Sequence, residues 1–174
     1  MPTTIERPRS DEHAEFYGAY VALVPDGDLV ELLREQQQET VRLVRDLSDA
    51  DAMRAYAPGK WTVKEVIGHL SDAERIFAYR ALRFARGDAR ELAGFDETAY
   101  VPAGRFNTRR IADLLDEFQA IRTATVHLLR HLRPEELARR GTANGYAITV
   151  RAIAYVIAGH ERHHAAILRE RYGL

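Results

Sequence analysis

The sequence predicts an all-α fold, a four-helix bundle, and three observations support this prediction. Apolar residues recur every three or four positions in four long segments, and no segment alternates apolar and polar residues as a half-buried strand does. The length of 174 residues fits one domain with a single core. The connection 87–107 is longer than antiparallel neighbours need. We therefore expect it to cross the bundle, which leaves the second and third helices roughly parallel.

The chain divides into a lead-in, residues 1–27, and a single helical domain, residues 28–174. We expect the lead-in to be partly disordered, because it begins with polar residues before an aromatic and apolar run that is able to pack. It ends at a turn that contains Pro25 and Gly27. Asp28 is then a suitable N-cap for the first helix, predicted over about 29–47.

The other three helices follow from breakers, caps and periodicity. The second begins after a Pro-Gly-Lys-Trp breaker, where Thr62 and Glu65 form a capping box, and it runs to about Arg86. We interpret Trp61, the last residue of the breaker, as a packing anchor and not a site residue. The third helix is predicted over about 108–132 and the last over about 149–171, with a short turn and a loop between them.

The composition excludes several classes of function. The chain contains seven histidines and no cysteine, which excludes disulfides, iron–sulfur clusters, cysteine-based zinc sites and a protein thiol nucleophile. A formal net charge of −1 argues against nucleic-acid binding. The N-terminal residues lack the apolar region of a secretory signal, and the most apolar stretch, 152–159, is too short to cross a bilayer. We therefore expect a cytoplasmic protein with no nucleic-acid or membrane partner.

The positions of the histidines on their helices separate candidate ligands from surface residues. His160 and His164 lie four residues apart on the face of the last helix that carries its apolar residues, a spacing that brings two imidazoles onto one metal ion. His127 and His131 have the same spacing but lie opposite the apolar stripe of the third helix, so we expect them to face solvent. His163 falls at the edge of its stripe or beyond it.

A third ligand has to come from another helix. His69, on the second helix, lies at the border of the apolar stripe, a position that permits ligation without requiring it. The alternative is that these are hydrogen-bonded core residues, since each unsatisfied buried imidazole carries a penalty on the order of 1–3 kcal/mol. Spacing and facing alone leave the two interpretations about equally open.

The segment 160–164 also fits His-Glu-x-x-His, the zincin metalloprotease pattern, in which Glu161 is the general base. The context argues against a protease. Zincins usually take a third ligand downstream, whereas only ten residues follow His164, with Glu170 as the one candidate among them. No strand pattern is present to form the edge that holds a peptide.

A different resemblance covers nearly the whole chain. The segment 58–75, from the Pro-Gly-Lys-Trp breaker through His69-Leu70 to Arg75, and the closing Gly159-His160-x-x-x-His164 resemble the motifs of the DinB/YfiT-like superfamily. This resemblance implies a four-helix bundle with a long crossover and a histidine triad, which corresponds here to His69, His160 and His164. It also implies one divalent metal ion, zinc, nickel or iron, and a homodimer.

The chemistry is inferred from the same resemblance. Relatives include transferases and isomerases that use low-molecular-weight thiols, so the leading expectation is a thiol S-transferase that acts on small electrophiles. The absence of cysteine agrees with this, because the nucleophilic sulfur would come from a thiol cosubstrate. One alternative is a metal-dependent hydrolase, as other relatives are described. Another is a non-catalytic metal-binding bundle with a structural or sensory role.

Five residues are candidates for supporting roles, each with an alternative. Glu161 either acts as a base or orients a ligand, or else is the buried partner of an arginine. Asp72 is a candidate to hold the second nitrogen of His69, although a solvated carboxylate is favoured. Arg80 is a candidate to recognise an anionic thiol, although surface solvation is favoured. Gln36 and Thr40 interrupt the apolar stripe of the first helix, and they either line the cavity or form a hydrogen-bonded layer between helices.

Overall fold

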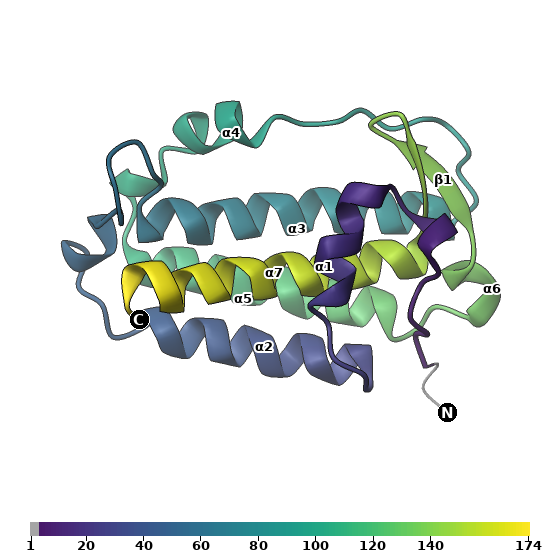
Figure 1. The fold of residues 1–174 in the computed structure, drawn as a ribbon, viewed down its shortest axis with the longest axis horizontal. Helices are drawn as coiled ribbons and strands as arrows, with labels where there is room; N and C mark the ends of the chain where they lie inside the picture. Colours follow the sequence, from purple (N-terminus) through teal and green to yellow (C-terminus); the bar gives the residue numbers. More distant parts are fainter. Residues whose placement is uncertain (1–3) are drawn as a thin grey trace.

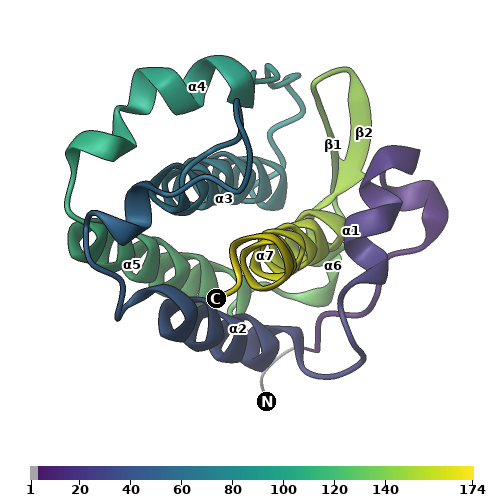
Figure 2. The same cartoon turned by 60° about the vertical axis from the view of Figure 1, so that its left-hand side comes forward.

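The computed structural model describes residues 4–174, and its four longest helices form a bundle (Figure 1). They are α2 (Leu29–Val44), α3 (Val63–Ala85), α5 (Ile111–Leu129) and α7 (Val150–Tyr172). Seen nearly end-on, α3 packs between α5 and α7, and α2 closes the opposite side against the same two helices (Figure 2). The predicted fold class is therefore confirmed. The disorder expected at the start of the lead-in includes residues 1–3, which lie outside the described residues.

Local sequence signals determine where the bundle helices begin. The Asp28 side chain accepts a hydrogen bond from the Val30 amide at 2.9 Å, which caps the first turn of α2. Thr62 and Glu65 form the predicted capping box at the start of α3, each side chain accepting from the other's backbone amide. The predicted helices agree with the observed ones to within three residues at each end.

The long crossover makes α3 and α5 parallel, as predicted. After α3 the chain returns along the length of the bundle before α5 begins (Figure 1). The return includes α4 (Glu97–Gly104) and a 3-10 turn, η4 (Phe106–Thr108). Phe106 packs so closely over Gly68 that a Cβ at that position would overlap its ring. This contact fixes the crossover to the N-terminal half of α3, which carries His69.

The structure contains a β-hairpin that the sequence analysis did not predict. Strands β1 (Arg140–Ala143) and β2 (Tyr146–Thr149) pair antiparallel, and the crossover joins them through backbone hydrogen bonds of Leu92. The expectation of a loop without strands was wrong here, because four-residue strands are too short to show alternation. The available signal was the turn dipeptide: Asn144 and Gly145 both have positive φ, 53° and 77°, as a type I′ turn requires.

The lead-in packs against the bundle through two 3-10 turns, η1 (Ser10–Glu12) and η2 (Glu15–Tyr17), and a short helix, α1 (Gly18–Ala22). α1 crosses α7 at Gly159, where a Cβ would overlap the backbone carbonyl of Tyr20. The buried Glu12 carboxylate is a second anchor, because it accepts hydrogen bonds from the Thr149 hydroxyl and from Arg151. The aromatic part of the lead-in therefore lies against the last helix.

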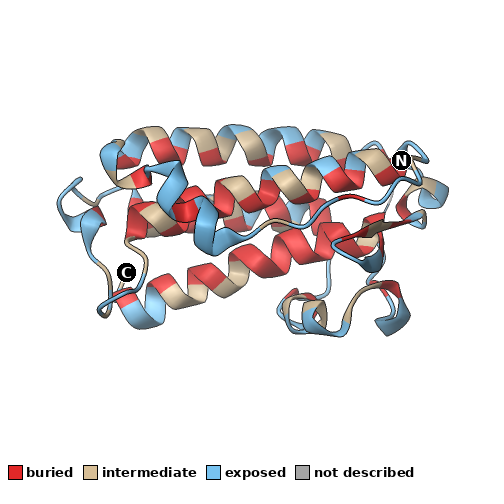
Figure 3. Cartoon of the chain, turned by 90° about the horizontal axis from the view of Figure 1, so that it is seen from above, coloured by how far each residue is buried: buried red, intermediate tan, exposed pale blue. Residues whose placement is uncertain are grey.

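The bundle helices are buried on their inward faces and exposed outside (Figure 3). α7 is the most enclosed: a continuous run from Ala152 to Glu161 is buried.

Among residues 4–174, no helix has both the length and the apolar character needed to span a membrane.

Candidate metal centre

Two helices bring three histidines together inside the bundle. α3 supplies His69, and α7 supplies His160 and His164, one helical turn apart. One ring nitrogen of each lies within 4.8 Å of those of the other two, and the Nε2 atoms of His69 and His160 are 3.0 Å apart. His69 is 6% exposed, and His160 and His164 are 8% exposed. The structure thus places the three predicted ligands at one point.

Burial keeps these imidazoles neutral. It lowers the pKa of His69 to about 4, against a smaller upward effect of the Glu97 carboxylate. Burial, together with the neighbouring imidazoles, lowers the pKa of His164 to about 3 and that of His160 well below its ordinary value. A neutral imidazole offers the lone pair that a metal ion requires. At neutral pH the cluster is therefore ready to act as a ligand set.

The donor set fits a divalent cation. Nitrogens bound to one tetrahedral zinc ion at 2.0–2.1 Å lie about 3.3 Å from one another. The 3.0 Å separation of the His69 and His160 nitrogens is close to this value. Three protein ligands leave further coordination positions open, as in catalytic rather than structural zinc sites. Imidazole also suits nickel and iron, so the ligands agree with all three expected ions.

His127, His131 and His163 lie where their helical angles predicted. His127 and His131 are exposed. His163 is half-buried at the margin of the site, with its ring 5.1 Å from that of His164 and 5.6 Å from that of Tyr20. His13, in the lead-in, is half-buried and its Nδ1 lies 2.9 Å from the Ala14 carbonyl.

Glu161 is held in a buried network behind the triad. Its carboxylate accepts hydrogen bonds from Arg122 at 2.6 Å, Thr40 at 2.7 Å and Gln36 at 2.5 Å. Arg122 also donates two bonds of 2.8 Å to Glu74. Burial acts to lower the pKa of Arg122, but Glu161 and Glu74 outweigh it and raise that pKa. Of the two environments expected for Glu161, the structure shows the buried arginine partner.

Gln36 and Thr40 form the interhelical layer that was one of their two predicted roles, since both bind Glu161 of α7 from α2. They also line a small cavity of about 200 Å³ with Glu161 and Arg162. That cavity is separate from the one that contains His69 and His160.

The two candidates on α3 lie in different environments. Asp72 is partly exposed, 3.7 Å from Arg75, and burial raises its pKa. Among residues 4–174 Asp72 makes no hydrogen bond to His69. This agrees with the role favoured from the sequence, a solvated carboxylate. Arg80 is only 4% exposed and lines the cavity beside the triad, donating to the Ala93 carbonyl at 2.9 Å. The expectation of surface solvation for Arg80 was wrong, because the crossover covers that side of α3.

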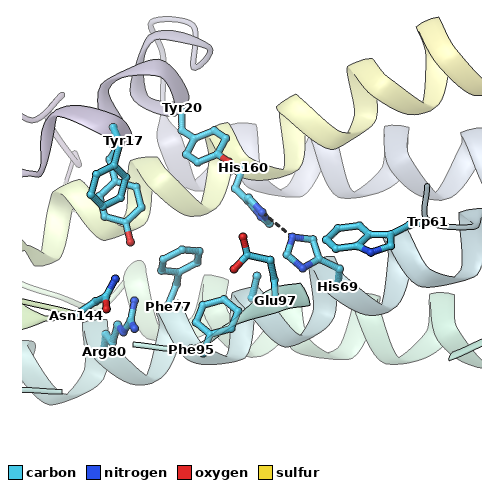
Figure 4. A pocket seen from close by; sticks show the side chains of 12 residues that line it. Tyr17, Tyr20, Trp61, His69, Phe77, Arg80, Phe95, Glu97, Asn144 and His160 are labelled. Atoms are coloured by element: carbon cyan, nitrogen blue, oxygen red, sulfur yellow. Dashed lines mark hydrogen bonds between the residues drawn. The ribbon is translucent and has the colours of Figure 1, made fainter. Parts of the chain in front are cut away.

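A cavity of about 300 Å³ opens beside the triad (Figure 4). His69, His160 and Trp61 line one end of it, and the Trp61 ring is tilted by 45° to that of His69, with ring centroids 4.8 Å apart. Trp61 also borders a second cavity of about 270 Å³ that reaches His164. Trp61 packs against the core, as expected from the sequence, and it also lines both cavities, which was not expected.

Three further residues of this cavity were missed. Tyr17 and Tyr20 come from the lead-in, and the Tyr20 ring lies 5.5 Å from that of His160. The aromatic run of the lead-in was the signal that pointed to them. Glu97, on α4, lies beside His69 and His160 in Figure 4. No periodicity in the crossover indicated Glu97.

The fold and the site together define a class: four-helix bundles with a long crossover and a buried three-histidine cluster. The chain belongs to the DinB superfamily, whose family model matches residues 32–168. Among solved structures it is similar to YfiT from Bacillus subtilis, described as a probable metal-dependent hydrolase with an unusual four-helix bundle topology. The TM-score is 0.73 at 22% identity, over 97% of this chain and 94% of that one. Comparison with curated proteins gives no significant match.

Proposed function

We propose that this protein is a divalent-metal-dependent hydrolase whose ion is held by His69, His160 and His164. The observation that carries the proposal is the meeting of three buried, neutral imidazoles, two of which, His69 and His160, line one end of a cavity. The similarity in fold to YfiT, described as a probable metal-dependent hydrolase, supports the same chemistry. A bound divalent ion supplies Lewis acidity, which polarises a substrate carbonyl and makes water a stronger nucleophile.

Glu97 is the residue that we propose as proton acceptor. It lines the cavity with His69 and His160, and its charge acts on the pKa of His69. Its side chain is exposed, so it is free to exchange protons with solvent. Glu161 is unsuited to this role, because three donors already bind its carboxylate on the far side of the triad.

The proton transfers of the proposed hydrolysis involve only Glu97, water and the substrate. The water oxygen forms a bond to the electrophilic carbon of the substrate while Glu97 accepts the water proton. The bond from that carbon to the leaving group breaks, and Glu97 returns the proton to the leaving group. Trp61 borders the reacting end and limits the access of other water molecules.

Metal analysis tests the site. We expect elemental analysis of the chain, purified without chelator or reconstituted with zinc, nickel or iron(II) and desalted, to find about one ion per chain. His160→Ala should lose the ion. His131→Ala, which changes an exposed histidine just after the end of α5, is the control and should retain it. A wild-type chain that stays metal-free after reconstitution would overturn the proposal.

Turnover tests the catalytic step. With a panel of activated esters and amides, Glu97→Gln should lower kcat about 10²- to 10⁴-fold without loss of bound metal. Glu91→Gln, an exposed crossover carboxylate that does not line the cavity, is the control and should keep wild-type kcat. Equal kcat for Glu97→Gln and wild type would remove Glu97 from the mechanism.

Thiol S-transfer is the second candidate, favoured by one observation: one cavity reaches His69 and His160 and a second reaches His164, so a thiol and an electrophile have separate approaches to the triad. In this reaction the sulfur of a free thiol bonds to the electrophile, the leaving group departs, and the thiol proton goes to it. A product that forms only when thiol and electrophile are both present identifies this reaction, whereas hydrolysis is independent of thiol. Stabilisation by metal with no turnover in either assay would identify a non-catalytic site.

A further inference from the structure

Arg80 is a buried guanidinium without a counter-ion in the described part of the chain. It is 4% exposed and donates from Nη2 to the Ala93 carbonyl at 2.9 Å, and no carboxylate of residues 4–174 lies within ion-pair distance of it. Arg122, which is equally enclosed, is bound by two carboxylates. Because a buried charge is costly unless it is paired, Arg80 is the place where the cavity lacks a negative group.

Two polar groups accompany Arg80 at that end of the cavity. Figure 4 shows the Tyr17 hydroxyl and the Asn144 amide on the same side as Arg80, away from His69. Arg80 acts electrostatically on Tyr17: burial raises the pKa of the Tyr17 phenol, and the Arg80 charge opposes this rise. Lead-in, hairpin and α3 each contribute one hydrogen-bonding side chain, so this end of the cavity is built from three separate segments.

The cavity therefore has a cationic end and a histidine end, with an apolar wall between them. Arg80 follows His69 by eleven residues on α3, which places the two Cα atoms about 16 Å apart along the helix. Phe77 and Phe95 lie between these two ends (Figure 4), and Ala73 also lines the cavity. A molecule that fills the cavity would have an anionic group at one end and an apolar body.

We propose that Arg80 is the binding residue for a carboxylate group of the substrate, whose reactive carbon lies at the histidine end. This proposal rests on the proposed function for the role of the triad. The guanidinium donates to the Ala93 carbonyl and interacts with the Tyr17 hydroxyl, but no carboxylate of residues 4–174 pairs with it, and its planar fork suits a carboxylate. A single negative charge is favoured over a dianion, because Glu97 lines the same cavity. The substrate class is thus a monocarboxylate with an aromatic or aliphatic body.

Fluorescence of Trp61 tests the subsite directly. Trp61 is the one tryptophan of the sequence and lines the cavity, so its emission reports occupancy. We would titrate the protein as purified, and again after treatment with EDTA, with 3-phenylpropionate, 3-phenylpropionamide and phenylphosphonate. The acid should bind at least about tenfold more tightly than the amide, as a charge-assisted hydrogen bond gives. The phosphonate dianion should bind more weakly than the acid.

Variants assign the preference to Arg80. Arg80→Met should bind acid and amide equally, and Arg80→Lys should keep part of the preference for the acid. Arg86→Met removes an exposed arginine at the end of the same helix and should leave the preference unchanged. If Arg80→Met fails to fold, the comparison of acid with amide on the wild-type chain still decides the matter, since equal affinities there overturn the proposal.

The outcomes separate this inference from the proposed function. Because EDTA removes direct binding of a carboxylate to metal, a preference that persists in the metal-free chain belongs to the protein. If the chain takes up no metal but prefers the acid, the carboxylate subsite is supported and the hydrolase function is rejected. If the chain binds metal but does not distinguish the acid from the amide, the carboxylate subsite is rejected and the hydrolase function is unaffected.

Discussion

Replacement of Arg122 by methionine is expected to be one of the most destabilising single changes in this bundle. The side chain is 1% exposed and binds Glu74 twice at 2.8 Å, Glu161 at 2.6 Å and the Leu33 carbonyl at 2.8 Å. Methionine fills similar space without charge, so Glu74 and Glu161 would remain buried with no counter-ion. Removing one partner of a buried ion pair costs about 3–5 kcal/mol. Because two carboxylates lose the same partner here, we expect about 5 kcal/mol.

Glu161→Gln should cost less, because the Arg122 charge keeps Glu74 as its partner. The loss is then one charge-assisted hydrogen bond, about 1.5–3 kcal/mol. Arg75→Met is the surface control: Arg75 is half exposed and lies 2.6 Å from Glu117, a pair worth at most about 1 kcal/mol.

Urea denaturation at pH 7, followed by far-UV circular dichroism, measures all three changes in the free energy of unfolding. The expected order is Arg122→Met, then Glu161→Gln, then Arg75→Met. A loss of 1 kcal/mol or less for Arg122→Met would refute the reasoning, as would a larger loss for Glu161→Gln. If Arg122→Met is unfolded without urea, the comparison of Glu161→Gln with Arg75→Met still tests the network.

Two further predictions concern the lead-in and the triad. Gly159→Ala should cost about 1–3 kcal/mol, as overpacking does, because the new Cβ would overlap the Tyr20 carbonyl and displace α1. Thermal denaturation checks this, and a melting temperature equal to that of wild type would contradict the packing. The metal-free chain should lose stability as pH falls below about 6.5, because the folded-state pKa values of His69 and His164 are about 4 and 3. Above that pH both states hold these imidazoles neutral, whereas below it the unfolded chain binds more protons, with a slope of up to about 1.4 kcal/mol per pH unit for each histidine. Urea titrations of the EDTA-treated chain from pH 7.5 to 5 measure the slope. His164→Phe should reduce this dependence of stability on pH, and His131→Ala should not. Identical slopes for wild type and His164→Phe would show that the buried histidines do not cause the loss of stability.

The bundle and its ligands were predictable because both depend on local periodicity. His160 and His164 share a face with the apolar residues of α7, whereas the identically spaced His127 and His131 do not, and the structure separates the two pairs as the angles predicted. The caps at Asp28 and Thr62 depend on a side chain and an amide two or three residues away. Such features need no knowledge of how helices are arranged.

The surroundings of the triad were not predictable in this way. A helical angle tells which side of α3 carries Arg80, but the crossover that covers this side has no periodicity. The Ala93 carbonyl meets Arg80 and Glu97 lines the cavity because η4 and the hairpin hold the crossover against the bundle. The four-residue strands could not be predicted from alternation either, and the Asn144-Gly145 turn was the one sequence signal for the hairpin.

The role of Glu161 was open to a sharper argument from sequence. Three charged residues take apolar positions in their helices: Glu74 lies four residues after Leu70, Arg122 four after Phe118, and Glu161 four after Ile157. Two carboxylates and one arginine on inward faces are most simply satisfied by one another, because none can be buried alone. The carboxylate nearest to the histidines in sequence, Glu161, therefore has a structural role.

The bundle helices thus hold the ligands, while the lead-in, crossover and hairpin supply groups that line the cavity and would contact a substrate. Variants in these segments should alter substrate preference without altering metal content, and ligand variants should abolish both.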